Sequence, residues 1–187
     1  MNAKRGYVPE DERNFSPEAI HTMQTADIGK PGTRVWDPKE HMTEKAGKGS
    51  EQIDALLEKP FWVVDPLPHQ VPVEGEGQFF AVEAFFLNSP MRSLLLQKHA
   101  RILLKLNCYY DLWVAEGEKD QWIRNPDPAI IYRLAADERR FLNILLGEDI
   151  LIVLSDFDMT VYNADSRMIE LIRTLACAEG LFVWQPA

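Results

Sequence analysis

Cysteine is scarce in this sequence, and its two cysteines, Cys108 and Cys177, stand among apolar residues without the CxxC spacing of metal or redox motifs. The pattern predicts two buried thiols that stay reduced, as in a cytoplasmic protein, rather than a disulfide framework. The chain also lacks a long apolar run, since its longest ones, such as residues 150–154, are far too short to cross a bilayer. No apolar stretch of the signal-peptide kind follows Met1. We therefore expect no membrane partner and a cytoplasmic location.

Basic residues are fewer than acidic residues in this sequence. The chain has 20 Lys and Arg against 29 Asp and Glu, which gives a net charge of −9. Most of the excess falls on residues 61–187, with 11 bases and 18 acids, whereas residues 1–60 hold 9 and 11. Nucleic-acid binding needs clustered lysine and arginine, so no nucleic-acid partner is expected. An acidic domain instead attracts a basic protein partner over a long range, although acidity also serves solubility alone.

The four histidines do not form a metal-binding pattern. His21, His41 and His69 are scattered over segments expected to be loops, so neither a zinc site nor another cofactor is predicted. His99 lies near the apolar stripe of a helix expected at residues 91–106. A lone histidine in such a place is typically partly buried, with one hydrogen bond, rather than a base or a ligand.

The first 49 residues differ from the rest. Proline and glycine interrupt them repeatedly, and their hydrophobic periodicity is weak. One short helix is expected at residues 17–25, because Ser16 is a good N-cap and Pro17 suits the first helical position. We interpret residues 1–49 as an irregular N-terminal arm and residues 50–187 as a single α+β domain.

Apolar spacing in the domain indicates helices and strands in irregular alternation. Helical spacing is clearest at residues 91–106, and residues 78–87 also favour a helix, although their aromatic side chains suit a strand as well. Further helices are expected at 50–59, 125–139 and 167–179, and strands at 61–64, 109–116, 121–124, 141–146, 150–154, 160–162 and 181–184. Most strands are joined by short turns. This predicts a largely antiparallel sheet packed with three or four helices.

The run ILIVLSDFDMT, residues 150–160, contains the one motif with catalytic potential. It resembles the first motif of the haloacid dehalogenase-type phosphatases, in which an apolar strand delivers an aspartate nucleophile. The resemblance implies that Asp156 attacks the phosphoryl group and that Asp158 acts as acid and base, with Mg²⁺ bridging them. It also implies that the expected helix 167–179 and strand 181–184 continue an opening βαβ unit.

Three departures weigh against this reading. Too little chain follows the motif to hold the rest of such a domain, and the family's later lysine and acidic metal-binding motifs have no place here. Trp184-Gln185-Pro186 stands where the end of the next strand requires Ser or Thr. The alternative is that residues 155–158 form a turn between two apolar strands. The balance favours the turn, and a protein that is not an enzyme.

Candidate binding residues gather around the hairpin expected at residues 109–124. They are Trp122, Tyr109, Tyr110, Glu116, Glu118 and Asp120. Aromatic side chains on a surface often anchor a protein partner, and Trp122 stands close to charged residues. Neighbouring acids would speed the approach of a basic partner.

Four stretches, residues 77–83, 103–111, 159–163 and 178–184, resemble a family of small bacterial proteins for which no activity is established. The resemblance covers about residues 61–187 and implies no functional residue. In size and acidity the chain is similar to immunity proteins that neutralise bacterial toxins. The leading hypothesis is a non-enzymatic protein-interaction module that binds a basic partner as an immunity protein or antitoxin does. The alternatives are a Mg²⁺-dependent phosphatase that uses Asp156 and Asp158, and a structural subunit of a larger assembly.

Overall fold

The computed structural model describes residues 50–72, 74, 77–117, 121–137, 141–155 and 158–186. They belong to one of two compact units, the unit that spans Trp36–Ala187. The predicted arm, residues 1–49 with the helix expected at 17–25, lies outside the described residues. Glu118, Asp120 and Asp156 lie outside them as well.

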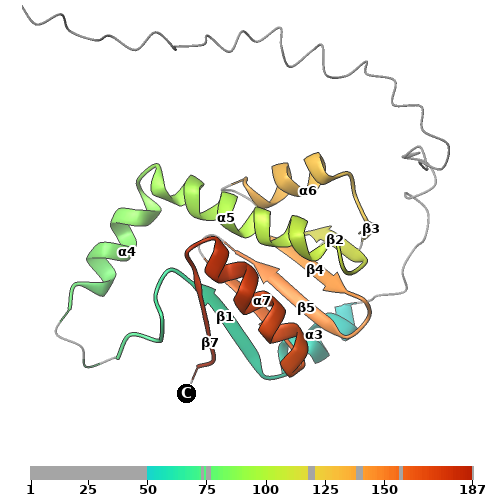
Figure 1. Cartoon of the computed structure of the whole chain (residues 1–187), viewed down its shortest axis with the longest axis horizontal. Helices are drawn as coiled ribbons and strands as arrows, with labels where there is room; N and C mark the ends of the chain where they lie inside the picture. Colours follow the sequence, from blue (N-terminus) through green and yellow to red (C-terminus); the bar gives the residue numbers. More distant parts are fainter. Residues whose placement is uncertain are drawn as a thin grey trace, which may run out of the picture. The chain divides into compact units, whose positions relative to one another are not determined.

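The seven strands of the described residues form one sheet in the order β3-β2-β4-β5-β6-β1-β7 (Figure 1). Every neighbouring pair is antiparallel. The strands are β1 (Phe61–Asp65), β2 (Leu112–Glu116), β3 (Ile123–Arg124), β4 (Leu142–Leu146), β5 (Ile150–Leu154), β6 (Met159–Tyr162) and β7 (Phe182–Trp184). The predicted α+β class with an antiparallel sheet is confirmed.

Five helices accompany the sheet in the described part of the chain, rather than three or four. They are α3 (Ser50–Leu57), α4 (Phe79–Leu87), α5 (Met91–Leu106), α6 (Pro128–Ala135) and α7 (Ser166–Ala178). The predicted start of a strand at residue 109 is wrong, because residues 107–110 extend the last turn of α5. There the Tyr110 N–H donates to the Leu106 carbonyl at 3.0 Å. Of the helices described, none has the length and apolar character needed to span a bilayer.

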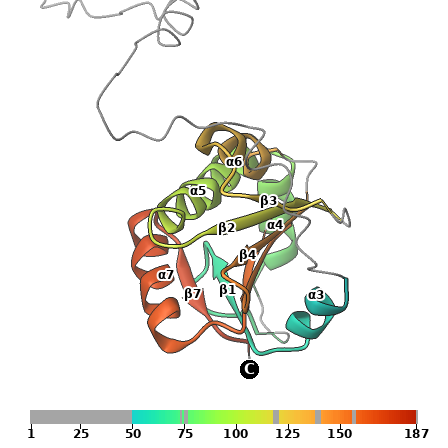
Figure 2. The ribbon, with the colours of Figure 1, turned by 90° about the vertical axis from the view of Figure 1, so that its right-hand side faces the viewer.

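The first face of the sheet carries the main core. Ile144 and Ile152 point to this face and pack in one cluster with residues of α5, α6 and α7. Figure 2 shows α5 and α7 on the same side of the sheet. Ile102 and Leu106 of α5 are fully buried there. Each such side chain contributes about 1.5–3 kcal/mol when it leaves water, so this layer dominates the stability of the fold.

The second face of the sheet has a thinner cover. Leu145, Leu151 and Val153 point to it and form a smaller cluster with Leu56 of α3. Figure 2 shows α3 on the side of the sheet opposite α7. Side chains of a strand alternate between the two faces, so apolar residues in succession along β4 and β5 mean that both faces are buried there.

Glu179 ties α5 to the end of α7. Its carboxylate accepts hydrogen bonds from Arg101 Nε at 2.6 Å and Lys105 Nζ at 2.5 Å. The carboxylate side chain is only 9% exposed. Burial favours the protonated acid, but the hydrogen bonds from Lys105 and Arg101 and their positive charges outweigh it and lower the pKa of Glu179.

Two predictions about burial are wrong. Cys108 and Cys177, predicted to be buried, are both exposed and free. Cys177 follows Ala176, which is the residue of this pair that faces the core, so the thiol lies on the outer side of α7. His99, in contrast, is fully buried on α5 rather than partly. Within the described residues, neither of its ring nitrogens makes a hydrogen bond of good geometry.

Candidate functional site

Helix α4 contributes no buried residue to the hydrophobic core. None of its nine residues is buried, although the sequence FFAVEAFFL is apolar almost all round. Phe80 is 81% exposed and Phe85 is 63% exposed. Figure 1 shows α4 beyond the end of the helix layer formed by α5 and α7. A helix that is apolar on all sides is normally buried on all sides, so α4 has apolar surface to spare for another molecule.

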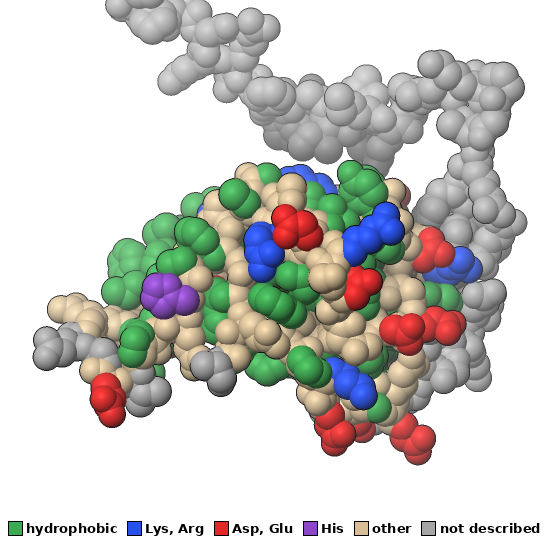
Figure 3. Space-filling view, turned by 60° about the horizontal axis from the view of Figure 1, so that its bottom comes forward, with side chains coloured by type: hydrophobic (Ala, Val, Ile, Leu, Met, Phe, Trp, Pro, Cys, Tyr) green, Lys and Arg blue, Asp and Glu red, His purple; other side chains and the backbone are tan. Residues whose placement is uncertain are grey.

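The exposed apolar side chains continue from α4 onto the first turns of α5. Met91 and Leu94 are exposed there, the latter by 54%. We call Phe80, Phe85, Met91 and Leu94 the α4 surface. Figure 3 shows hydrophobic side chains gathered at this end of the molecule, whereas charged side chains are spread over the remainder of the same face. Contiguous patches of this kind on a protein surface commonly mark interaction sites.

A capped turn holds α4 to α5. The Asn88 side-chain amide donates to the Ala84 carbonyl at 2.7 Å, and the backbone N–H of Met91 donates to Ser89 Oγ at 3.2 Å. Pro90 then starts the next helix, where its missing N–H does no harm. The sequence Asn88-Ser89-Pro90 therefore fixes where one apolar helix ends and the other begins.

The inner side of α4 borders a cavity of about 370 Å³, which we call the α4 pocket. Its floor belongs to the second face of the sheet and includes Phe61, Val63, Thr160 and Trp184; α4 contributes Phe79, Val82, Glu83 and Phe86; residues 65–67 and 69–71 and Asp158 complete it. The lining is mainly apolar. The volume falls within the range of about 300–1,000 Å³ that is usual for sites that bind small molecules or single side chains.

Three carboxylates line the α4 pocket from three different elements. Asp65 ends β1, Glu83 lies on α4, and Asp158 directly precedes β6. Pro66 and Pro68 turn the chain away from the sheet after β1, and Asp65 Oδ1 accepts the Leu67 N–H at 2.5 Å in that turn. Among the residues that the structure describes, no lysine or arginine forms an ion pair with any of the three.

The apolar surroundings and the repulsion by neighbouring acids disfavour the charged forms of Asp65 and Asp158. Burial raises the pKa of Asp65, and the charge of Glu83 adds to this, while the Leu67 N–H opposes it. Burial also raises the pKa of Asp158, with further contributions from Asp65 and Glu83. Asp158 itself is exposed at the mouth of the pocket, so the surrounding protein atoms displace only part of its water. The pocket therefore holds negative charge for which the described residues supply no basic counterion.

Trp184 leaves a hydrogen-bond donor without a partner in the pocket floor. Its indole Nε1 is buried and donates no hydrogen bond within the described part of the chain. An unsatisfied buried donor costs about 1–3 kcal/mol.

Ser155 follows β5 and Asp158 precedes β6, while Asp156 between them lies outside the described residues. β5 and β6 are antiparallel neighbours, with Leu154 opposite Met159. The Ser155 N–H donates to the Asp158 carbonyl at 3.0 Å and closes the hairpin. The haloacid dehalogenase resemblance requires the motif strand itself to begin a βαβ unit. Here a second strand follows at once, and α7 comes only after β6.

Of the predicted binding residues that the structure describes, Glu116 lies apart from Tyr109 and Tyr110. Glu116 ends β2, whereas Tyr109 and Tyr110 precede its beginning, so the two groups lie at opposite ends of one strand. Trp122 is half-buried and packs on the cluster of the second face. Tyr109 is 67% exposed, while Tyr110 packs against the main core. None of these residues lines the α4 pocket.

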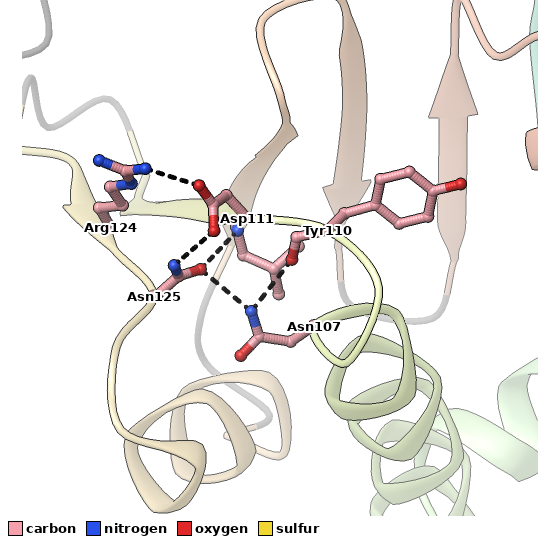
Figure 4. A network of polar contacts seen from close by, with 6 residues as sticks. Asn107, Tyr110, Asp111, Arg124 and Asn125 are labelled. Atoms are coloured by element: carbon pink, nitrogen blue, oxygen red, sulfur yellow. Dashed lines mark hydrogen bonds and ion pairs between the residues drawn. The ribbon is translucent and has the colours of Figure 1, made fainter. Parts of the chain in front are cut away.

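A network of side-chain hydrogen bonds joins the segment that follows α5 to β2 and β3 (Figure 4). Asn125 adopts a left-handed backbone with φ of 43° and donates to Asp111 Oδ1 at 2.8 Å. Its Oδ1 accepts from the Leu112 N–H at 2.8 Å and from Asn107 at 3.1 Å. Hydrogen bonds from Asn125 and Arg124 lower the pKa of Asp111. Figure 4 shows the ring of Tyr110 pointing away from this network, which therefore joins α5, β2 and β3 structurally.

Sequence reasoning missed the acids of the α4 pocket and the role of α4. Asp65 and Glu83 stand alone in the sequence, 18 positions apart, and only the fold brings them near Asp158. The available signal was α4 itself, because four phenylalanines in nine residues leave no polar face for solvent.

No group of three or more His, Cys, Asp or Glu side chains within the described residues has the geometry to hold a metal ion. The three carboxylates of the α4 pocket therefore do not converge on one point, although they are close enough for their charges to interact. Comparison with known proteins adds no further guide, since no family model, no curated protein and no solved structure matches the chain.

Proposed function

We propose that the chain is a protein-interaction module that binds a basic partner segment along the α4 surface and the α4 pocket. The observation that carries this proposal is the exposure of α4, in which no residue is buried and only Glu83, Phe86 and Leu87 are half-buried. Phe80 and Phe85 alone present roughly 300 Å² of surface, if an aromatic side chain offers about 150–250 Å². Covering them with an apolar partner removes that surface from water.

The energetics of a short helix support the same conclusion. Isolated helices shorter than about 12–15 residues are marginal in water, and most helices are stabilised by packing of an apolar face. α4 has nine residues, and among the helices and strands of the described chain its main neighbour is α5. A partner that packs on α4 would therefore stabilise the helix and bury its phenylalanines together.

Charge decides the chemistry of the partner. The chain carries a net charge of −9, and the α4 pocket contains Asp65, Glu83 and Asp158. A basic segment would approach faster than a neutral one at low ionic strength and would neutralise these acids when bound. An immunity-type role is the special case in which the basic partner is a toxin, and neutralisation of that toxin by the full chain is its test.

An enzyme that uses the same pocket is the second candidate. Carboxyl groups with a raised pKa in an apolar cleft are typical of general acids, and Asp65 and Asp158 have this character. The three acids would repel a phosphate ester, so a neutral or cationic substrate fits better than the substrate of a phosphatase. Turnover that Asp158→Asn abolishes, while Asp149→Asn leaves it intact, would favour this candidate over a binding module.

The binding proposal is tested with a synthetic amphipathic helix that carries leucine along one face and lysine elsewhere, and with the same helix carrying glutamate in place of lysine. Isothermal titration calorimetry measures both affinities for the full chain. We expect the basic helix to bind and the acidic helix not to bind. The double variant Phe80→Ser/Phe85→Ser should weaken binding by about tenfold or more, because it removes the central apolar contacts. Phe141→Ser is the matched control, since Phe141 is also exposed but does not line the pocket.

Hydrogen exchange locates the contact in the same samples. The amides of residues 79–87 should gain protection when the basic helix binds. Equal binding of the double variant, or protection elsewhere only, would contradict the proposal. If the peptides fail to bind and the chain forms a dimer that the double variant dissociates, a second copy covers α4. If α4 is already protected in the free monomer, residues 1–49 cover it. Either result replaces the proposed partner.

A further inference from the structure

We propose that the α4 pocket is the socket for one lysine or arginine side chain of the partner segment. This inference rests on the proposed function and adds the identity of the anchor. The α4 surface is a site for apolar side chains, but the pocket behind it combines apolar walls with carboxylates. A long cationic side chain matches both properties, because its stem is aliphatic and only its tip is charged.

The walls of the pocket suit the stem of such a side chain. Phe79 and Phe86 line it from α4, and Trp184 lines it from the floor. Lysine and arginine side chains pack their methylene groups on apolar surface, and a cation near the face of an aromatic ring is attracted by its electrons. An apolar side chain would fill the same space, but it would leave the carboxylates without a counterion.

The charged tip of the side chain would lie near Asp65, Glu83 and Asp158. These acids come from β1, from α4 and from the residue before β6, and their negative charges together attract a cation into the pocket although they do not converge on one point. Within the described residues no lysine or arginine already pairs with them. Interactions of this kind are stronger in a partly dry cavity than on an open surface.

Binding of a cation should be linked to protons. Burial raises the pKa of Asp65 and of Asp158, and an incoming positive charge would stabilise their ionised forms. The affinity should then increase as the pH rises through their pKa values. His69 and Glu83 are the remaining titratable groups of the lining.

The direct test uses two small probes on the full chain, Nα-acetyl-lysine-N-methylamide and its norleucine analogue, which lacks the charge. Binding is followed by NMR through the indole N–H signals, with Trp184→Phe to assign the signal of Trp184. We expect the lysine probe to shift this signal and the norleucine probe to bind at least about tenfold more weakly. The double variant Glu83→Gln/Asp158→Asn should remove this preference. Glu148→Gln, an exposed acid in the β4–β5 turn, should keep it.

Titration from acidic to neutral pH completes the test, because burial raises the pKa of Asp65 and of Asp158 above the ordinary value of a carboxyl group. The affinity for the lysine probe should rise with pH in the wild type and also in His69→Gln. Equal binding of both probes, or a preference that survives Glu83→Gln/Asp158→Asn, would overturn the inference. The amphipathic helix can still bind α4 in that case, so the proposed function is judged separately. If the amphipathic helix does not bind but the lysine probe does, the inference about the α4 pocket holds and the proposed interaction module does not.

Discussion

Replacing the buried His99 by leucine should change the pH dependence of stability in a way that can be calculated. His99 is 0% exposed, and its ring nitrogens lack hydrogen bonds of good geometry within the described residues. Burial, with the positive charge of Lys98, lowers the pKa of His99 to about 4, while the Val64 backbone opposes the shift. The imidazole is therefore neutral in the folded protein above that pH, and leucine can fill nearly the same space without a buried polar atom.

The sign follows from proton binding. The unfolded chain titrates this histidine near pH 6.5, whereas the folded protein does so near 4, so the unfolded state binds more protons between these values. The stability contribution is complete above about pH 6.5 and is lost as the pH falls towards 4. Between about pH 7.5 and pH 5 the loss amounts to about 2 kcal/mol. Asp65 and Asp158, whose pKa values are raised, act with the opposite sign, but they are present in both proteins.

Urea unfolding of the wild type and of His99→Leu, followed by tryptophan fluorescence at both pH values, measures the effect. We expect the variant to gain about 2 kcal/mol relative to the wild type when the pH falls to about 5, which corresponds to a difference of about 1 M in the midpoint shift. His69→Gln, the change of an exposed histidine, should show no such gain. If the advantage of His99→Leu is the same at both pH values, His99 titrates normally, and an acceptor or water reaches its ring.

Substitutions at three further positions test the packing and the network. Asn125→Ala should lower the free energy of unfolding by about 2–3 kcal/mol in thermal or urea unfolding, because it removes the side chain that links Asp111, Leu112 and Asn107. Asn125→Gly should lose about 1 kcal/mol less, because glycine tolerates the left-handed backbone. Glu179→Gln should cost about 1 kcal/mol at neutral pH, since Arg101 and Lys105 are partly solvated, and this difference should vanish in acid, below the lowered pKa of Glu179. Trp122→Ala should cost about 2 kcal/mol through lost packing on the second face, and an unchanged affinity for the basic helix would exclude Trp122 as an anchor.

Most of the fold could be predicted because local pattern and tertiary environment agree. Residues 91–106 repeat apolar side chains at helical spacing, and α5 spans Met91–Leu106 as expected. Residues 142–146 and 150–154 form short apolar runs separated by Gly147, whose φ of 62° suits a tight turn between β4 and β5. Each of these signals lies within a few residues, so no knowledge of distant contacts is needed.

The site could not be predicted, because the residues that form it lie far apart in the sequence. Asp65 and Glu83 meet only when β1 lies beside β6 and α4 closes over the end of the sheet. Asp158 was singled out through a family resemblance, yet its neighbours in the fold give it another environment. The error on Cys177 has a similar origin, since an apolar neighbourhood in sequence does not reveal which side of α7 faces the core.

Helix α4 is an element whose sequence and surroundings in the fold disagree. Its sequence, with four phenylalanines and one acid, is that of a helix buried on all sides, but the fold buries none of its residues. The inner side faces a cavity with carboxylates, which would be a poor site for permanent burial in a core. Phe80 and Phe85 are exposed on the outer side. An apolar helix with an acidic hollow behind it fits the proposed role as one half of an interface. The proposed partner would be apolar where it meets Phe80 and Phe85 and positively charged where it enters the pocket.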